Sequence, residues 1–392
     1  MKSTIKLWLR APARLGGAMK IMPDELLLPP RTIMRRGGVS GLLKDCSVFG
    51  ARGILVHGKS VLVSGVVAKM MAAGVPGQAV KTWQHPGGEP DLLQLESLLA
   101  VARDHRAEWI AGVGGGSVID LAKACAGLLA APQPAVDYHN GASIPPSRIP
   151  LIVAPTTAGT GSEATIVCVL TNHETGVKRS FRHASFMARL VLLDPELLAG
   201  SPPPVIAHAG MDAFTQAVES YVSIGSTWFS DQFAIQGLCM IAASLEPVFA
   251  DSRSEKAADL LMGSYLAGLS LSNARLGIVH GLAHPLGARF HVPHGLACAV
   301  CLPYAIEFNR EAMGAKYGRL SEAVGGDLLA ATNRLLRVFK IASPFAGKTI
   351  PDRAKVIEET LTSGSTAANP RKVTAADVDG LLDRMFGERG SE

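Results

Sequence analysis

Short apolar segments alternate with helical patterns over the first half of the chain. Residues 91–105 and 117–130 carry apolar side chains at helical spacing. The segments around and between them are short and apolar, as buried strands are. They lie at 31–34, 53–58, 79–83, 108–114, 150–156 and 188–194. This alternation predicts an α/β fold, a largely parallel sheet with helices on both faces.

The pattern changes after Asp194. The proline-rich segment 201–210 marks a boundary, and almost no strand-like segment follows it. Long helical patterns lie instead at 213–223, 230–250 and 254–274. Thr374-Ala-Ala-Asp377 has the form of a capping box at the start of a last helix. We therefore expect an α/β domain at 1–198 and an all-α, helical domain at 199–392.

Composition is that of a well-packed enzyme. With 392 residues, 48% of them apolar and 18% charged, the chain is long enough for two cores and too apolar for disorder. No apolar run approaches the roughly 18 residues that a spanning helix needs. The densest run, 296–306, contains a proline and suits a core helix better. We therefore expect no membrane partner.

The net charge of +5 comes from one end of the chain. Five basic residues and no acidic one fall in the first twenty positions, so the remainder is neutral and no nucleic-acid partner is expected. This stretch lacks the clean apolar segment of a signal peptide. We favour a leader without a role in the fold, and a cytoplasmic protein. The five residues are Lys2, Lys6, Arg10, Arg14 and Lys20.

Six cysteines are scattered along the chain, and Cys298 and Cys301 form a C-x-x-C pair. A zinc or redox role would require a second pair or a thioredoxin-like context, and neither is visible. Because the pair lies in an apolar helical run, we interpret these residues as buried, reduced thiols.

GILVHGKS, at 53–60, fits the written pattern of a nucleotide-binding P-loop. In a P-loop the four variable positions form a loop, whereas 54–56 are Ile, Leu and Val, as in a buried strand. We therefore expect a strand that ends in Gly58, Lys59 and Ser60, and no P-loop.

GVGGGSVIDLAK, at 112–123, predicts a strand that runs through Gly114, Gly115 and Gly116 into a helix. Ser117 could cap this helix, with Asp120 three residues further on. Glycines at such a helix start let a pyrophosphate approach free backbone amides. The alternative is a tight strand-to-helix turn with no ligand.

APTTAGTGSEAT, at 154–165, is a second strand end, rich in hydroxyl groups. Thr156, Thr157, Thr160 and Ser162 could bind ribose or phosphate. Alternatively, they hydrogen-bond to their own backbone in a turn.

Four histidines fall within 280–294, in an apolar segment. His280 and His284 share one helix face, and a turn at 293–295 could bring His294 back toward it. Several buried histidines are costly without a partner, and metal is a common one. Asp212, four residues before Gln216 on an apolar helix, also needs a cation or donors, unless it is a helix N-cap.

These segments together resemble the iron-containing (group III) alcohol dehydrogenase family. The motifs are GGGSxxDxAK, PTTAGTGSE, DAxxxxxE and HGxAHPxG…PHG, and the match extends from about Leu28 to the last helix. The resemblance implies a Rossmann-like dinucleotide-binding domain followed by a helical domain, the two-domain fold of dehydroquinate synthase. It places a metal and a nicotinamide between them. We expect a homo-oligomer, a dimer or larger.

Matched residue by residue, the family's metal ligands fall on Asp212, position 216, His280 and His294. Position 216 departs, because Gln216 stands where the motif has His. An amide oxygen is a weaker ligand, so we expect Fe²⁺, or Zn²⁺, at reduced occupancy. The resemblance also implies a proton relay at His284.

For the cofactor, the resemblance implies that Lys178 reaches NAD(P). Gly58 stands where family members that prefer NAD often carry an Asp for the ribose hydroxyls. With Lys59 and Ser60 beside it and no acid nearby, we expect NADP(H) to be preferred, with NAD(H) as the alternative. The implied reaction is reversible hydride transfer between NAD(P)H and a small aldehyde or ketone, assisted by the metal as a Lewis acid.

Three other functions are alternatives. A metal-independent maleylacetate reductase is favoured by Gln216 but not by Asp212. A dehydroquinate synthase-like lyase needs many cations for its anionic substrate, and the histidine segment offers only Arg275 and Arg289 nearby. A relative without activity would not be expected to keep Asp212 and the histidines. The sequence does not name the substrate.

Overall fold

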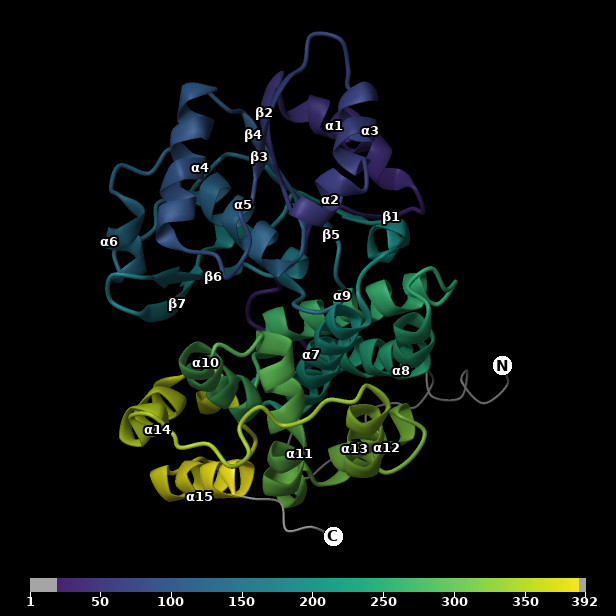
Figure 1. The fold of residues 1–392 in the computed structure, drawn as a ribbon, viewed down its shortest axis with the longest axis vertical. Helices are drawn as coiled ribbons and strands as arrows, with labels where there is room; N and C mark the ends of the chain where they lie inside the picture. Colours follow the sequence, from purple (N-terminus) through teal and green to yellow (C-terminus); the bar gives the residue numbers. More distant parts are fainter. Residues whose placement is uncertain (1–19, 388–392) are drawn as a thin grey trace.

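The computed structural model describes residues 20–387 and divides into an upper α/β part and a lower helical part (Figure 1). Most of the basic stretch interpreted as a leader lies outside the described residues. Lys20, at its end, pairs with Asp24 at 2.5 Å.

The upper part is built on a six-stranded sheet in which every neighbouring pair is parallel. All six expected strands are present, in the spatial order β1-β8-β5-β4-β2-β3. Their buried positions are apolar because helices cover both faces. The strands are β1 (Thr32–Met34), β2 (Arg52–His57), β3 (Ala79–Gln84), β4 (Trp109–Gly114), β5 (Leu151–Pro155) and β8 (Leu190–Leu193).

Successive residues of a strand enter opposite cores. Leu55 packs with α1 (Leu42–Cys46) and α3 (Val66–Ala72), whereas Ile54 and Val56 belong to the core that contains α4 and α5. Figure 1 shows the two groups of helices on either side of the sheet. The other helices of this part are α2 (Lys59–Val63), α4 (Leu92–Asp104), α5 (Gly116–Leu128) and α6 (Ala135–His139).

Residues 52–57 form strand β2, which confirms the strand interpretation of GILVHGKS. Gly53 does not belong to a phosphate loop. A Cβ at this position would lie 2.1 Å from the Trp109 ring, so the glycine makes room for the indole of the neighbouring strand.

An antiparallel hairpin, β6 (Val167–Asn172) and β7 (Val177–Arg182), was not predicted. It lies outside the main sheet. Residues 167–172 alternate between partly buried and buried, and a polar turn follows, so a weak strand signal was present in the sequence.

The proline-rich segment is largely a helix start. Helix α7 (Pro203–Val222) carries prolines in its first turn, where a missing N–H costs nothing. Asp212 therefore lies in mid-helix, and the N-cap alternative for it is wrong. The boundary expected at residue 198 falls between β8 and α7 and stays a prediction.

The lower part confirms the helical patterns, and no strand follows β8 within residues 20–387. Segment 296–306 lies inside a helix, although it contains Pro303. Thr374 and Asp377 form the expected capping box. The helices are α8 (Trp228–Ala250), α9 (Ala257–Ala274), α10 (Ile278–Phe290), α11 (His294–Met313), α12 (Ala315–Ala323), α13 (Leu328–Val338), α14 (Arg353–Thr362) and α15 (Ala375–Phe386).

Among residues 20–387, one helix, α8, is long and apolar enough to cross a membrane by length and composition alone, which the apolar runs of the sequence did not indicate. Its best window has a mean hydropathy of 1.6 and is 44% buried inside the protein. Core helices meet the same criterion, and α8 packs against α7 and α9.

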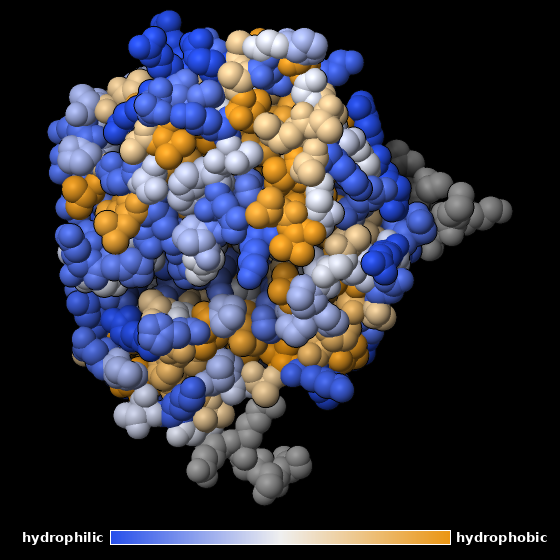
Figure 2. Space-filling model, turned by 45° about the horizontal axis from the view of Figure 1, so that its top comes forward, coloured by the Kyte–Doolittle hydropathy of each residue, from blue (hydrophilic) through white to orange (hydrophobic). Residues whose placement is uncertain are grey.

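Some large hydrophobic side chains stay at the surface. Val63 on α2 is 76% exposed, and Figure 2 shows hydrophobic residues in a band across one face, among hydrophilic ones. Contiguous exposed apolar surface is typical of interfaces. The homo-oligomer expected from the resemblance stays a prediction.

Buried Lys123 joins the glycine-rich helix to the loop after β5. Its ammonium donates to Ser162 O at 2.7 Å, Ser162 Oγ at 3.0 Å, Thr165 Oγ1 at 3.1 Å and Val167 O at 2.6 Å. Burial lowers the pKa of Lys123, and this set of acceptors is what compensates the buried amine.

We predict that Lys123→Met lowers the free energy of unfolding by about 3 kcal/mol or more, because several buried acceptors lose their donor. Lys81→Met is the control, because the Lys81–Asp104 pair, at 2.8 Å, is exposed and screened by solvent, so its loss should change the free energy of unfolding far less. Urea unfolding followed by circular dichroism measures both. Equal losses in the two variants would contradict this role of Lys123.

Candidate active site

Two predicted loops meet at the carboxyl ends of β4 and β5, which are adjacent strands. The Thr156 amide donates to Gly114 O at 2.9 Å. A Cβ on Gly116 would lie 2.7 Å from Thr160 Cγ2, so only glycine permits this approach. Thr157 lies beside Gly115. The structure thus brings the glycine loop and the threonine loop together at the sheet edge where dinucleotides bind in such folds.

Helix α5 begins earlier than expected. Its N-cap is Gly115, in an extended conformation, and Ser117 is already inside the helix. The expectation that Ser117 caps the helix is therefore wrong. Because Gly116 can enter the first turn against Thr160, the backbone amides of the turn stay free of side-chain caps.

Asp120 holds the second loop in place. Its Oδ1 accepts from Ser162 Oγ at 2.5 Å, and its Oδ2 accepts from Val169 N at 2.9 Å. The hydroxyl of Ser162 thus bonds to a side chain of α5, and not to the backbone of its own turn as the alternative for this loop supposed. A direct contact of Asp120 with a cofactor stays a prediction.

Gly58 lies at the same edge, after β2. A Cβ there would lie 3.7 Å from Val118 Cγ2, in the first turn of α5. Lys59 and Ser60 follow it and are exposed. The GKS segment therefore neighbours the glycine loop, as a role at the cofactor ribose requires.

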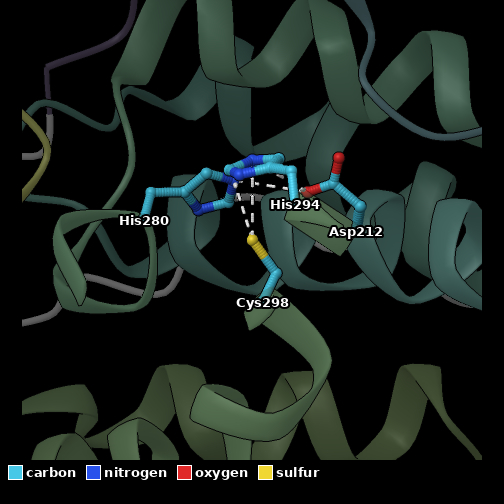
Figure 3. A group of neighbouring side chains, drawn as sticks. All are labelled: Asp212, His280, His294 and Cys298. Carbon is cyan, nitrogen blue, oxygen red and sulfur yellow. Dashed lines mark hydrogen bonds and ion pairs between the residues drawn. The ribbon is translucent and has the colours of Figure 1, made fainter. Parts of the chain in front are cut away.

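Helices α7, α10 and α11 bring a carboxylate and two imidazoles together (Figure 3). Asp212 Oδ1 lies 3.4 Å from His280 Nε2 and 3.9 Å from His294 Nε2. Asp212 and His280 are buried, at 2% and 3% exposed, and His294 is partly buried. Residues from positions 212, 280 and 294 thus converge, as the resemblance implied.

Glu219 fixes the orientation of His280. Its Oε2 lies 2.6 Å from His280 Nδ1, and its Oε1 accepts from Val279 N at 2.6 Å. With Nδ1 bound to a carboxylate, Nε2 is left to face Asp212. This role of Glu219 was not expected from the sequence, although Glu219 follows Asp212 by two helical turns on the same face.

The pKa values describe a pocket that attracts a cation. Burial raises the pKa of Asp212, but His294 and His280 lower it below its usual range, so the carboxylate stays charged. Burial lowers the pKa of His280, but Cys298 and Asp212 raise it well above its usual value. Burial lowers the pKa of His294 to about 4, which leaves a neutral imidazole.

Several buried oxygens within residues 20–387 have no hydrogen-bond partner, and two of them belong to this site: Asp212 Oδ1 and Gln216 Oε1. A buried, charged oxygen without a donor is costly, and a divalent cation would compensate it. The Asp212 carboxylate and the His280 and His294 imidazoles are ligands that suit Fe²⁺ or Zn²⁺. These residues therefore fit a metal.

Gln216 lies one helical turn after Asp212. Its Oε1 atom would be 3.3 Å from a Cβ on Gly161, so the oxygen lies beside the threonine loop. That Gln216 is a fourth ligand of the metal stays a prediction.

His284 lies near these residues without joining them. Its ring centroid is 6.5 Å from that of His280 and 5.2 Å from that of His294. Burial, together with the neighbouring histidines, lowers the pKa of His284 well below its usual value. A neutral imidazole here can accept or donate a proton.

The unpredicted hairpin carries Lys178 toward the histidines. Lys178 Nζ pairs with Glu89 Oε2 at 2.6 Å, and its charge contributes to the lowered pKa of His284 and of His294. The contact of Lys178 with a cofactor stays a prediction.

Cys298 lies at the site, although the C-x-x-C pair was expected to hold only buried, reduced thiols. The thiol is buried and reduced, as expected, but its sulfur lies 3.8 Å from His280 Nε2 and 3.6 Å from His294 Nε2. The contact could not be predicted from the sequence, because the residues around Cys298 are apolar and only the packing of α10 on α11 brings its sulfur to the histidines.

Comparison with known proteins identifies the family. Residues 29–195 match the model for iron-containing alcohol dehydrogenase, and residues 206–386 match the C-terminal model of the same family. A probable alcohol dehydrogenase, EutG, of Escherichia coli (strain K12) is 36% identical over 300 residues, which are 76% of each protein. The chain belongs to the iron-containing alcohol dehydrogenase family.

Other members are similar over nearly the whole chain. Lactaldehyde reductase of Escherichia coli (strain K12) is 28% identical over 382 residues, 91% of this chain and 98% of that protein. Among solved structures, a 1,3-propanediol oxidoreductase superposes with a TM-score of 0.86 at 29% identity, covering 92% of this chain and 99% of the other. A sulfoacetaldehyde reductase from Bifidobacterium kashiwanohense, in complex with NAD⁺, gives 0.85 at 25% identity, covering 92% and 98%. The expected fold is thereby confirmed, as is an oxidoreductase of alcohols and aldehydes.

We predict that Glu219→Gln weakens Zn²⁺ binding about 10- to 100-fold, because an amide orients the His280 ring less strongly than a carboxylate does. Competition with a chromophoric chelator measures the affinity. The exposed Glu358 provides the control, and Glu358→Gln should leave the affinity unchanged. Wild-type affinity in Glu219→Gln would mean that Glu219 does not support a metal ligand.

Proposed function

We propose that this alcohol dehydrogenase works with Asp212, His280 and His294 as metal ligands, in a reversible hydride transfer between NAD(P)H and a small aldehyde or ketone. The observation that carries the proposal is the buried Asp212 Oδ1 atom, which has no donor within residues 20–387 and faces two imidazole nitrogens at 3.4 and 3.9 Å. When bound there, a divalent metal would supply Lewis-acid stabilisation of negative charge on the substrate oxygen.

The protein's own residues would align the reactants. The free amides at the start of α5 suit the cofactor pyrophosphate, and Thr156 and Thr157 lie where hydroxyls can meet the cofactor. His284, neutral and beside His294, suits the proton exchange that accompanies hydride transfer at the substrate oxygen.

The competing functions have less support. A maleylacetate reductase would not need the buried carboxylate, whose Oδ1 lacks a donor within the described chain. A lyase of the dehydroquinate synthase type would need free cations, and Arg289 is paired with Glu359 at 2.6 Å. The expected reduction of occupancy by Gln216 and the cytoplasmic location stay predictions.

We predict that the enzyme oxidises NADPH or NADH with at least one short aldehyde of a panel. Chelation should abolish this activity, and Zn²⁺ or Fe²⁺ should restore it. Asp212→Ala should lower kcat/KM by about 100-fold or more, a loss of several kcal/mol of transition-state stabilisation. Asp24→Ala, at an exposed position, is the control. Full activity after complete chelation, or in Asp212→Ala, would exclude the metal mechanism.

We further propose that NADP(H) is preferred over NAD(H). Gly58 offers no carboxylate beside the glycine loop, and Lys59 is exposed at the same strand end. A carboxylate there would repel a 2′-phosphate by roughly 3–4 kcal/mol before screening, at about 4–5 Å and an effective dielectric near 20. Its absence, with a lysine present, favours the extra phosphate.

We predict that Gly58→Asp shifts the ratio of kcat/KM for NADPH and NADH by about 10-fold or more toward NADH. The site has room for the side chain, since the nearest atom would be 3.7 Å from the new Cβ. Ser64→Asp, which adds the same charge at the end of α2, should leave the ratio unchanged. A wild type that prefers NADH, or an unchanged ratio in Gly58→Asp, would refute the assignment.

A further inference from the structure

A sulfur atom completes the group of potential ligands between α7, α10 and α11. The ligand atoms of Asp212, His280, His294 and Cys298 all lie within 4.8 Å of one another. Figure 3 shows the Cys298 side chain directed at the two imidazoles from below the carboxylate. Cys298 follows His294 by four residues on α11, so the helix presents both on one face.

The spacing of these atoms suits coordination of one ion. For zinc, bonds of about 2.0–2.2 Å to nitrogen or oxygen and about 2.3 Å to sulfur place tetrahedral ligands about 3.4–3.6 Å apart. Asp212 Oδ1 and His280 Nε2 are separated by 3.4 Å, and Cys298 Sγ and His294 Nε2 by 3.6 Å. Two other pairs are wider, Cys298 Sγ to His280 Nε2 at 3.8 Å and Asp212 Oδ1 to His294 Nε2 at 3.9 Å, so the atoms must draw slightly closer to become ligands.

The Gln216 amide is the weaker candidate for the remaining position. Its oxygen lies beside Gly161 of the threonine loop. Divalent iron and zinc bind amide oxygens less tightly than imidazole, and a thiolate binds zinc strongly. Chemistry therefore favours the sulfur of Cys298 over the oxygen of Gln216.

We propose that Cys298 is the fourth protein ligand of the metal, in place of an imidazole at position 216, and that the resulting Asp-His-His-Cys site favours Zn²⁺ over Fe²⁺. The inference rests on the proposed metal site. When the sulfur–metal bond forms, the thiol proton passes to solvent. Without metal, burial raises the pKa of this thiol to about 12, so it is protonated at neutral pH.

The test uses the full-length protein, stripped of metal by chelation and reloaded with Co²⁺. A thiolate ligand gives Co²⁺ a strong near-ultraviolet charge-transfer band, which nitrogen and oxygen ligands do not give. We expect the band in the wild type and its loss in Cys298→Ser. Cys301→Ala, one turn away on the same helix and also buried, should retain it.

Affinity provides a second measurement. Cys298→Ala should weaken Zn²⁺ binding by more than the roughly 10- to 100-fold typical of residues that only orient a ligand, and Gln216→Ala should change it by less than about 10-fold. Stoichiometric Co²⁺ binding without the band would overturn the cysteine ligand while leaving the metal site intact. No Co²⁺ binding, or binding unaffected by Asp212→Ala, would overturn the metal site as well.

Discussion

Asp212 carries a charged carboxylate into the middle of the helical part, and its Oδ1 atom has no donor within the described residues. A buried carboxylate needs a positive or hydrogen-bond-donating partner, and the side chains around Asp212 are arranged accordingly. Helices α10 and α11 supply imidazoles, and Glu219 fixes one of them through a second carboxylate. A pocket with two carboxylates and two imidazoles favours a cation, and a fold that builds it accepts a cost in stability when the cation is missing.

The α/β part supplies the complementary surface. Strand ends β2, β4 and β5 meet at one edge of the sheet, and glycines at 58, 114 and 116 keep that edge free of side chains. Lys123 and Asp120 join α5 to the threonine loop and to the hairpin. The hairpin in turn carries Lys178, whose charge acts on the histidines. The two parts are thus linked through the same residues that would align a cofactor with the metal.

The hydrophobic pattern of the sequence predicted the strands, the helices and the edge of the sheet where the loops meet. Six strands were found because their apolar runs are buried on both faces, and the carboxyl ends of parallel strands share an edge, so the loops at 112–123 and 154–165 were expected together. Helical spacing and the family resemblance identified Asp212, His280 and His294 as candidate metal ligands.

The start of α5 was misplaced by two residues because glycine, a poor helix former, enters the first turn to approach Thr160. The hairpin was missed because its strands are only half-buried. Cys298 was missed because its neighbours are apolar, and its contact with the histidines exists only through packing of α10 on α11.

The central claim is that one metal ion occupies the point where these side chains converge. Crystals of the zinc-loaded enzyme, measured on both sides of the zinc absorption edge, test it most directly. The account predicts a single anomalous peak between Asp212 Oδ1 and the Nε2 atoms of His280 and His294, at about 2.0–2.2 Å from each. A zinc-loaded crystal with no anomalous peak at this position, or with its peak elsewhere in the protein, would contradict it.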